Sequence, residues 1–173
     1  MKSFIKQKLI EALIKNNCHP IKITQDMVNE VNQFKTDEDF LRSGGFSNAT
    51  LDRAAFGFTD EDITTLMPNQ LNIKWKDDLE NVKHEVLIWK VKNKGLSEID
   101  WAVKINLNEP IDVIYEKHNF YIDDGHHRYY AAKILKKPLN VNLEIKQNPI
   151  IKLSSTLSYD DFHRCVFKQI KHG

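Results

Sequence analysis

Near both ends of the chain, apolar residues recur at spacings of three and four, which is typical of helices that bury one face. The first such segment predicts a helix through Phe4, Ile5, Leu9, Ala12 and Leu13. A second helix is expected within residues 20–34, with Thr24 or Asp26 as its N-cap. The last segment predicts a C-terminal helix that buries Phe162, Val166, Phe167 and Ile170.

In the middle of the chain, apolar and polar residues alternate, and this period of two predicts strands. The alternating apolar positions are Leu71, Ile73 and Trp75, then Ile111, Val113 and Tyr115, and finally Val141, Leu143 and Ile145. Residues 116–119 are expected to form the turn of a hairpin whose second strand covers residues 120–122. These segments predict a small β-sheet.

The remaining segments predict further helices and one long connection. A helix is expected from about His126 to Lys136, because Pro138 cannot continue it. Ser97 and Asp100 have the spacing of a capping box, and the short helix that they open is expected to bury Ile99, Trp101, Ala102 and Val103. Residues 77–95 fit either a helix or a strand around Val86–Val91. Residues 43–70 predict a loop, with a short helix opening near Thr59.

The expected fold class is therefore α+β, a small mixed sheet with helices packed on it. The length of 173 residues favours one domain. We expect a helical N-terminal extension over residues 1–70, a core over residues 71–146 and a C-terminal helix within residues 147–173.

Composition narrows the class of protein. Apolar residues make up 41% of the chain and charged residues 28%, as in ordinary globular proteins, and the net charge of +1 gives no global signal for nucleic-acid binding. No apolar run approaches membrane-spanning length. Cys18 and Cys165 form no CxxC pair and are expected to be reduced thiols. These features predict a cytoplasmic protein without a membrane partner.

Candidate chemistry concentrates in the sequence Asp123-Asp124-Gly125-His126-His127-Arg128, where a predicted strand becomes a predicted helix. The first turn of a helix leaves backbone N–H groups unpaired, and the helix dipole adds partial positive charge there, so this corner suits a phosphate. Arg128 can donate two charge-assisted hydrogen bonds to the anion, and His127 can donate another. Asp123 or Asp124 is expected to cap the helix, orient a histidine, hold a divalent cation or accept a proton.

A purely structural interpretation of this corner carries about equal weight from chemistry alone. An aspartate before a glycine is often only a turn and a cap. Arg128 paired with Asp123 would then be a surface ion pair, worth less than about 1 kcal/mol.

Residues 71–146 resemble the ParB/sulfiredoxin superfamily. The resemblance rests on "LSEIDWAVKINLNEPIDV", "YIDDGHHRYYAAKIL" and "LNVNLEI", which follow one another in the order and spacing of that superfamily. The pairs Pro110-Ile111 and Ala131-Ala132 stand where its strand begins and its helix continues. Members include CTP-binding partition proteins, ATP-dependent sulfinic acid reductases, free-serine kinases and proteins described as nucleases.

The resemblance implies that the turn binds nucleotide phosphates, with Gly125, His126, His127 and Arg128 as the phosphate loop and Asp124 as the carboxylate beside it. It implies an ATP-like nucleoside triphosphate with Mg²⁺, whose phosphoryl group is hydrolysed or transferred to a small-molecule or protein acceptor. His126 stands where sulfiredoxins carry a reactive cysteine, which argues against sulfinate reduction. The alternatives are a ParB-like DNA-binding protein or nuclease, and a non-catalytic interaction module of a phage or mobile element.

Two other segments carry candidate groups. One segment is Lys76, Asp77 and Asp78, which follow a predicted strand. If it reaches the turn, Lys76 is expected to contact a phosphate and an aspartate to bind a metal ion or accept a proton. A solvated turn that caps a helix is the favoured alternative. The segment from Arg42 to Ser47 contains Gly44-Gly45 and has the composition of an anion nest, although a structural connection is favoured. No zinc-like spacing of histidine and cysteine occurs.

Overall fold

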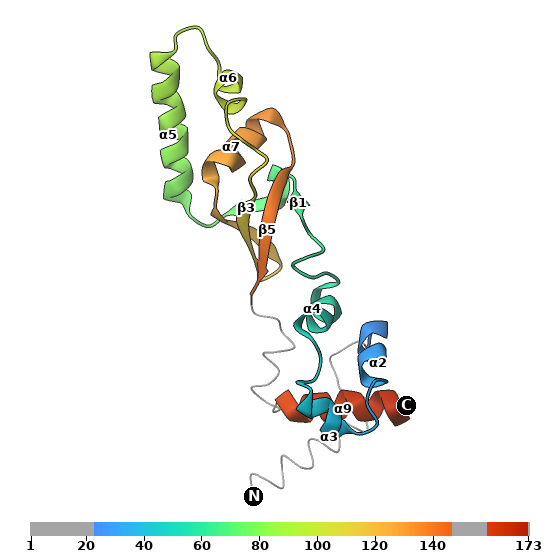
Figure 1. Cartoon of the computed structure of the whole chain (residues 1–173). Coiled ribbons are helices and arrows are strands. Elements are labelled where there is room, and N and C mark those ends of the chain that lie inside the picture. Colours follow the sequence, from blue (N-terminus) through green and yellow to red (C-terminus); the bar gives the residue numbers. More distant parts are fainter. Residues whose placement is uncertain (1–22, 147–158, 173) are drawn as a thin grey trace, which may run out of the picture. The chain divides into compact units, whose positions relative to one another are not determined.

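The computed structural model describes residues 23–146 and 159–172, and the chain divides into two compact units (Figure 1). One unit combines residues 1–59 with residues 147–173, and its described part is called the helical unit below. The other is the sheet unit, residues 60–146. The helix predicted between Phe4 and Leu13 lies outside the described residues.

The helical unit contains four described helices: α2 (Gln25–Val31), α3 (Asp37–Arg42), α4 (Asn48–Phe56) and α9 (Tyr159–His172). Thr24 is the N-cap of α2, as predicted, and its hydroxyl accepts a hydrogen bond from the N–H of Met27 at 3.3 Å. The prediction of a long loop was wrong where α4 forms. Ser47 caps that helix and Gly57 ends it in the left-handed conformation, with φ of 84°. The predicted helix near Thr59 does not form.

The core of the helical unit is aromatic. Phe40, Phe46 and Phe162 surround the fully buried ring of His163 at centroid distances of 5.3–5.7 Å. Cys165 is buried in the same cluster and is disulfide-bonded, so the prediction of a reduced thiol is wrong for this residue. Cys18 lies outside the described residues. Reduced cysteines therefore no longer support the prediction of a cytoplasmic location.

The sheet unit is built on five strands in the order β1-β5-β3-β4-β2. Their bounds are β1 Thr65–Leu66, β2 Leu71–Ile73, β3 Ile111–Glu116, β4 Asn119–Asp124 and β5 Leu139–Ile145. β3 and β4 form the predicted antiparallel hairpin, whereas β2 runs parallel to β4 and β5 parallel to β3. The mixed sheet of the predicted α+β fold is thus confirmed.

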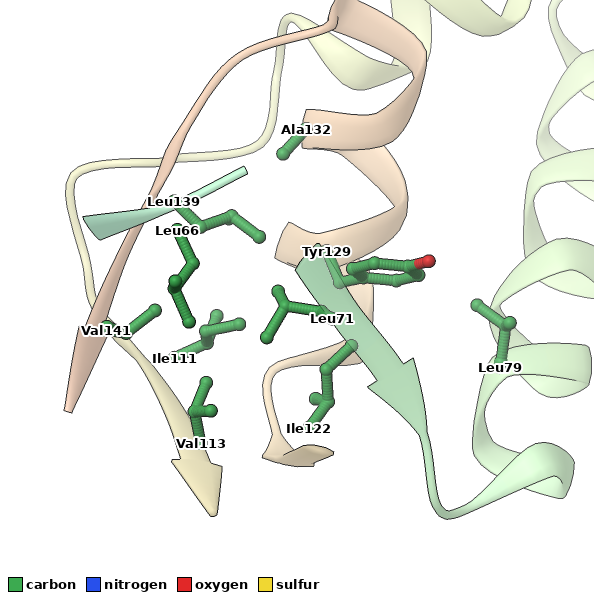
Figure 2. Close-up of a cluster of buried hydrophobic side chains, with 10 residues drawn as sticks. All are labelled: Leu66, Leu71, Leu79, Ile111, Val113, Ile122, Tyr129, Ala132, Leu139 and Val141. Atoms are coloured by element: carbon green, nitrogen blue, oxygen red, sulfur yellow. The ribbon is translucent and has the colours of Figure 1, made fainter. Parts of the chain in front are cut away.

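Helices lie between the strands in the sequence and cover the apolar face of the sheet. They are the 3-10 turn η1 (Pro68–Gln70) and the helices α5 (Lys76–Lys92), α6 (Glu98–Ala102) and α7 (His126–Leu135). Figure 2 shows Tyr129 and Ala132 of α7 and Leu79 of α5 around the side chains of Leu71 and Ile122. The segment 77–95, which fitted either a helix or a strand, forms most of α5.

The capping box of α6 is present: Asp100 accepts hydrogen bonds from the N–H and the hydroxyl of Ser97, which lower the pKa of the Asp100 carboxyl. Trp101 and Ala102 are buried as predicted. Ile99 and Val103 were predicted to be buried, but they are 56% and 63% exposed, because this short helix turns only one side toward α7.

Tyr129 makes the stability of the sheet unit sensitive to alkaline pH. Burial raises the pKa of its phenol above that of an exposed tyrosine. The unfolded chain therefore ionises first, so this contribution to stability is complete below pH about 10 and is lost as the pH rises through the folded pKa. We expect Tyr129→Phe to flatten the fall in unfolding free energy above pH 10, measured by urea denaturation.

Candidate phosphate-binding site

The corner between β4 and α7 depends on Gly125, the N-cap of the helix. Its φ of 108° is readily adopted only by glycine. A Cβ at this position would lie 2.4 Å from Cγ2 of Ile111 and 3.4 Å from Nη2 of Arg128. The first helical hydrogen bond runs from the N–H of Tyr129 to the carbonyl of Gly125 at 2.9 Å, and no side chain caps the helix. The N–H groups of residues 126–128 therefore precede the first helical bond, where a helix lacks internal acceptors.

An open pocket of about 400 Å³ lies at this corner. The turn supplies five consecutive lining residues, from Asp124 to Arg128. The opposite wall comes from α5, through Asp78, Asn81, Val82 and Glu85. The size is within the range of small-molecule sites, and the lining is polar and rich in titratable groups.

Arg128 is held at the edge of the pocket. Its Nη1 donates a hydrogen bond of 2.6 Å to the carbonyl of Pro110 and lies 3.8 Å from a carboxylate oxygen of Glu109. The side chain is 21% exposed, and Glu109 is largely solvated. One bond to the backbone fixes the guanidinium plane, and a guanidinium has five N–H donors, so donors remain for a ligand.

His127 is paired with a carboxylate across the pocket. Its Nε2 lies 2.6 Å from Oε2 of Glu85, although the two residues are 42 positions apart in the sequence. Both side chains are more than half exposed, so the pair contributes little to stability. It does orient the imidazole and leaves Nδ1 available for a proton or a ligand.

His126 is the buried histidine of the corner, with 6% of its surface exposed. Its Nε2 is inaccessible to solvent and has no hydrogen-bond partner among the described residues. Buried polar atoms are nearly always paired, so this ring nitrogen is an unsatisfied polar atom behind the wall of the pocket, and a ligand reaches it only if the side chain moves.

The pocket brings together only some of the site residues that were predicted from the sequence. Asp124, Gly125, His126, His127 and Arg128 line the pocket. The residues Asp123, Lys76 and Asp77 were also predicted, but they are not among the lining residues, and Asp78 takes the place expected for Asp77. On a helix, positions 78, 81, 82 and 85 share one face, whereas position 77 points about 100° away. That spacing was the available signal for Glu85 and Asn81, which the sequence predictions missed.

Two further predictions concern ions. No group of three or more histidine, cysteine, aspartate or glutamate side chains that could hold a metal ion occurs in residues 23–146 and 159–172.

The Gly44-Gly45 segment lines a pocket, but Glu30 already occupies the start of α4. Its carboxylate accepts hydrogen bonds from the N–H and hydroxyl of Ser47 at 3.2 and 2.9 Å. This internal anion takes the place that a phosphate would need.

Comparison of the chain with protein-family models, with curated proteins and with solved structures gives no match. Among the described helices, none is both long and apolar enough to cross a membrane. The site is therefore interpreted from the residues of this chain.

Proposed function

We propose that the pocket between α5 and α7 binds a nucleoside triphosphate together with Mg²⁺, and that the protein hydrolyses or transfers a phosphoryl group. The observation that carries this proposal is the open pocket at the start of α7, into which the whole turn from Asp124 to Arg128 faces. The resemblance of this turn to the ParB/sulfiredoxin superfamily points to the same class of ligand.

The turn offers several groups to an anion. Backbone N–H groups that precede the first hydrogen bond of a ten-residue helix lie at the positive end of its dipole. Arg128 has guanidinium donors left after its bond to Pro110. A phosphate that bound here would satisfy groups from three consecutive residues of the turn.

The same pocket carries three carboxylates, those of Asp78, Glu85 and Asp124. Next to a polyphosphate they would repel it, unless a cation accompanies the ligand. Mg²⁺ usually takes one or two protein carboxylates and completes its coordination with substrate phosphates and water, so a cage of three protein ligands is not required. Asp78 and Asp124 are the residues that would hold it. When bound, Mg²⁺ would neutralise charge on the transferring phosphoryl group.

The His127–Glu85 pair suits the role of a general base. Glu85 holds Nε2 of His127, so Nδ1 is the atom that accepts the proton of a water molecule or hydroxyl acceptor. The acceptor oxygen then forms its bond to phosphorus as the bond from phosphorus to the bridging oxygen of the leaving nucleoside diphosphate breaks. Arg128 and the turn amides stabilise the negative charge of the phosphoryl oxygens.

Thermal denaturation with common nucleoside triphosphates, in the presence and absence of MgCl₂, tests the proposal. We expect at least one nucleotide to raise the melting temperature only when Mg²⁺ is present, because ligands that bind the native state stabilise it by mass action. Asp78→Asn should reduce that shift strongly. Asp77→Asn, one residue away and outside the pocket lining, is the matched control and should leave it unchanged.

The absence of any nucleotide-dependent shift in the wild-type protein would contradict the proposal, as would equal losses in the two aspartate variants. Lys133 of α7 and Lys136, the residue that follows the helix, line a separate and mainly apolar pocket beside η1.

A further inference from the structure

The second half of α5 exposes an apolar stripe that nothing in the sheet unit covers. Leu87, Ile88 and Val91 are 56%, 43% and 72% exposed. On the connection to α6 and on α6 itself, Leu96, Ile99 and Val103 are also exposed, at 43%, 56% and 63%. Six large aliphatic side chains on one helical hairpin are more than the scattered apolar residues of an ordinary surface, and such clusters mark interaction sites.

The stripe lies opposite the side of α5 that packs on the sheet unit. Leu79, Val82 and Val86 face the core at spacings of three and four, while Leu87 and Val91 lie on the other side of the helix. In Figure 1, α5 stands at the edge of its unit and joins α6 through the connection at its C-terminal end. Within the sheet unit, the exposed side of α5 therefore has no helix packed against it.

The charges beside the stripe fit a second copy of α5. Glu85 and Lys92 lie one heptad apart on the same edge of it. Lys92 has no ion-pair partner in the part of the chain that the structure describes, and Glu85 keeps one carboxylate oxygen outside its contact with His127. In two antiparallel helices that cross between Ile88 and Trp89, Lys92 of each copy lies opposite Glu85 of the other. Twofold symmetry makes this contact twice.

We propose that the protein forms a homodimer through an antiparallel pairing of its α5 helices, in which Leu87, Ile88 and Val91 of the two copies pack together. Helices that pair in this way interdigitate apolar side chains along one stripe and match charges along its edges. The antiparallel arrangement also opposes the two helix dipoles. Because Glu85 lines the phosphate pocket, Lys92 of the second copy would add a positive charge at its rim.

Sedimentation velocity of the full chain over a wide range of protein concentration tests the proposal. We expect a dimer for the wild-type protein and a monomer for Val91→Glu, because each new carboxylate would be buried without a partner among the apolar side chains of the other copy. Met67→Glu is the matched control. Met67 is 38% exposed on another part of the sheet unit, so this variant should remain a dimer.

Charge exchange tests the register. Lys92→Glu should weaken association at least tenfold, because it places like charges together. The double variant Lys92→Glu, Glu85→Lys should restore it. A wild-type protein that sediments as a monomer at every concentration would overturn the proposal. So would a dimeric Val91→Glu variant, or binding of a monomeric wild-type protein to vesicles of anionic phospholipid that Val91→Glu abolishes.

Discussion

Gly125→Ala is expected to lower the unfolding free energy of the sheet unit by about 3 kcal/mol, because it combines two costs. A residue with a Cβ is strained at a φ of 108°, which costs about 1–3 kcal/mol. The new methyl group would also lie 2.4 Å from Cγ2 of the fully buried Ile111, and forcing such a contact in a packed core costs a similar amount. Relief by moving α7 would displace the amides that form the phosphate corner.

Urea denaturation followed by tryptophan fluorescence measures this loss selectively, since Trp75, Trp89 and Trp101 all lie in the sheet unit. Gly95→Ala is the matched control. Gly95 has a φ of 86°, but an added Cβ would find open space, so only the backbone strain remains. Equal losses in the two variants would show that the contact with Ile111 is easily relieved and that the corner is less rigid than the structure indicates.

The corner itself was predictable from the sequence. Alternating residues identified β3, the hairpin turn predicted β4, Gly125 marked the bend, and the alanine-rich segment before Pro138 set the end of α7. These are local signals, because the period of two, the need for φ above zero and the blocked N–H of proline act within a few residues. The five lining residues from Asp124 to Arg128 therefore came out of the sequence together.

The second wall of the pocket was not predictable, because it depends on how α5 packs against α7. Glu85 lies 42 positions before His127, and nothing in the local sequence brings them together. The helix itself was ambiguous for a physical reason. Val86 is buried, while Leu87, Ile88 and Val91 are exposed on the other sides, so the apolar residues do not trace one face. If these exposed residues pack against a second copy, as we propose, α5 has two buried faces, and such a helix lacks the usual amphipathic period.

In the helical unit, the prediction of a loop failed for a different reason. Glycine and serine at residues 43–47 indicated a loop, but Ser47 is the N-cap of α4, and Glu30, distant in sequence, completes the cap. Gly45 is there because the ring of the buried His163 leaves no room for a Cβ. A glycine required by packing and a glycine required by a ligand look the same in the sequence. The phosphate-nest prediction for this segment therefore had no local signal against it.

Arg128→Ala is expected to weaken binding of Mg²⁺-nucleotide by about 10- to 100-fold, which corresponds to the 1.5–3 kcal/mol of a hydrogen bond to a charged group. The guanidinium is the one lining side chain of the pocket that is positively charged at every working pH. Isothermal titration calorimetry of the variant and of the wild-type protein measures the change. Arg128→Lys should recover only part of the affinity, since an ammonium cannot donate two parallel bonds.

The Arg128→Ala variant needs a control, because Arg128 also donates to the carbonyl of Pro110. The control must distinguish the loss of a ligand contact from the loss of this bond within the protein. Glu109→Gln removes the carboxylate 3.8 Å from Nη1 and leaves that backbone bond intact. With less competition for the guanidinium, Glu109→Gln should bind nucleotide as tightly as the wild-type protein or more tightly. An unchanged affinity in a folded Arg128→Ala variant would mean that the phosphates do not contact this side chain, and the proposed mode of binding would have to be abandoned.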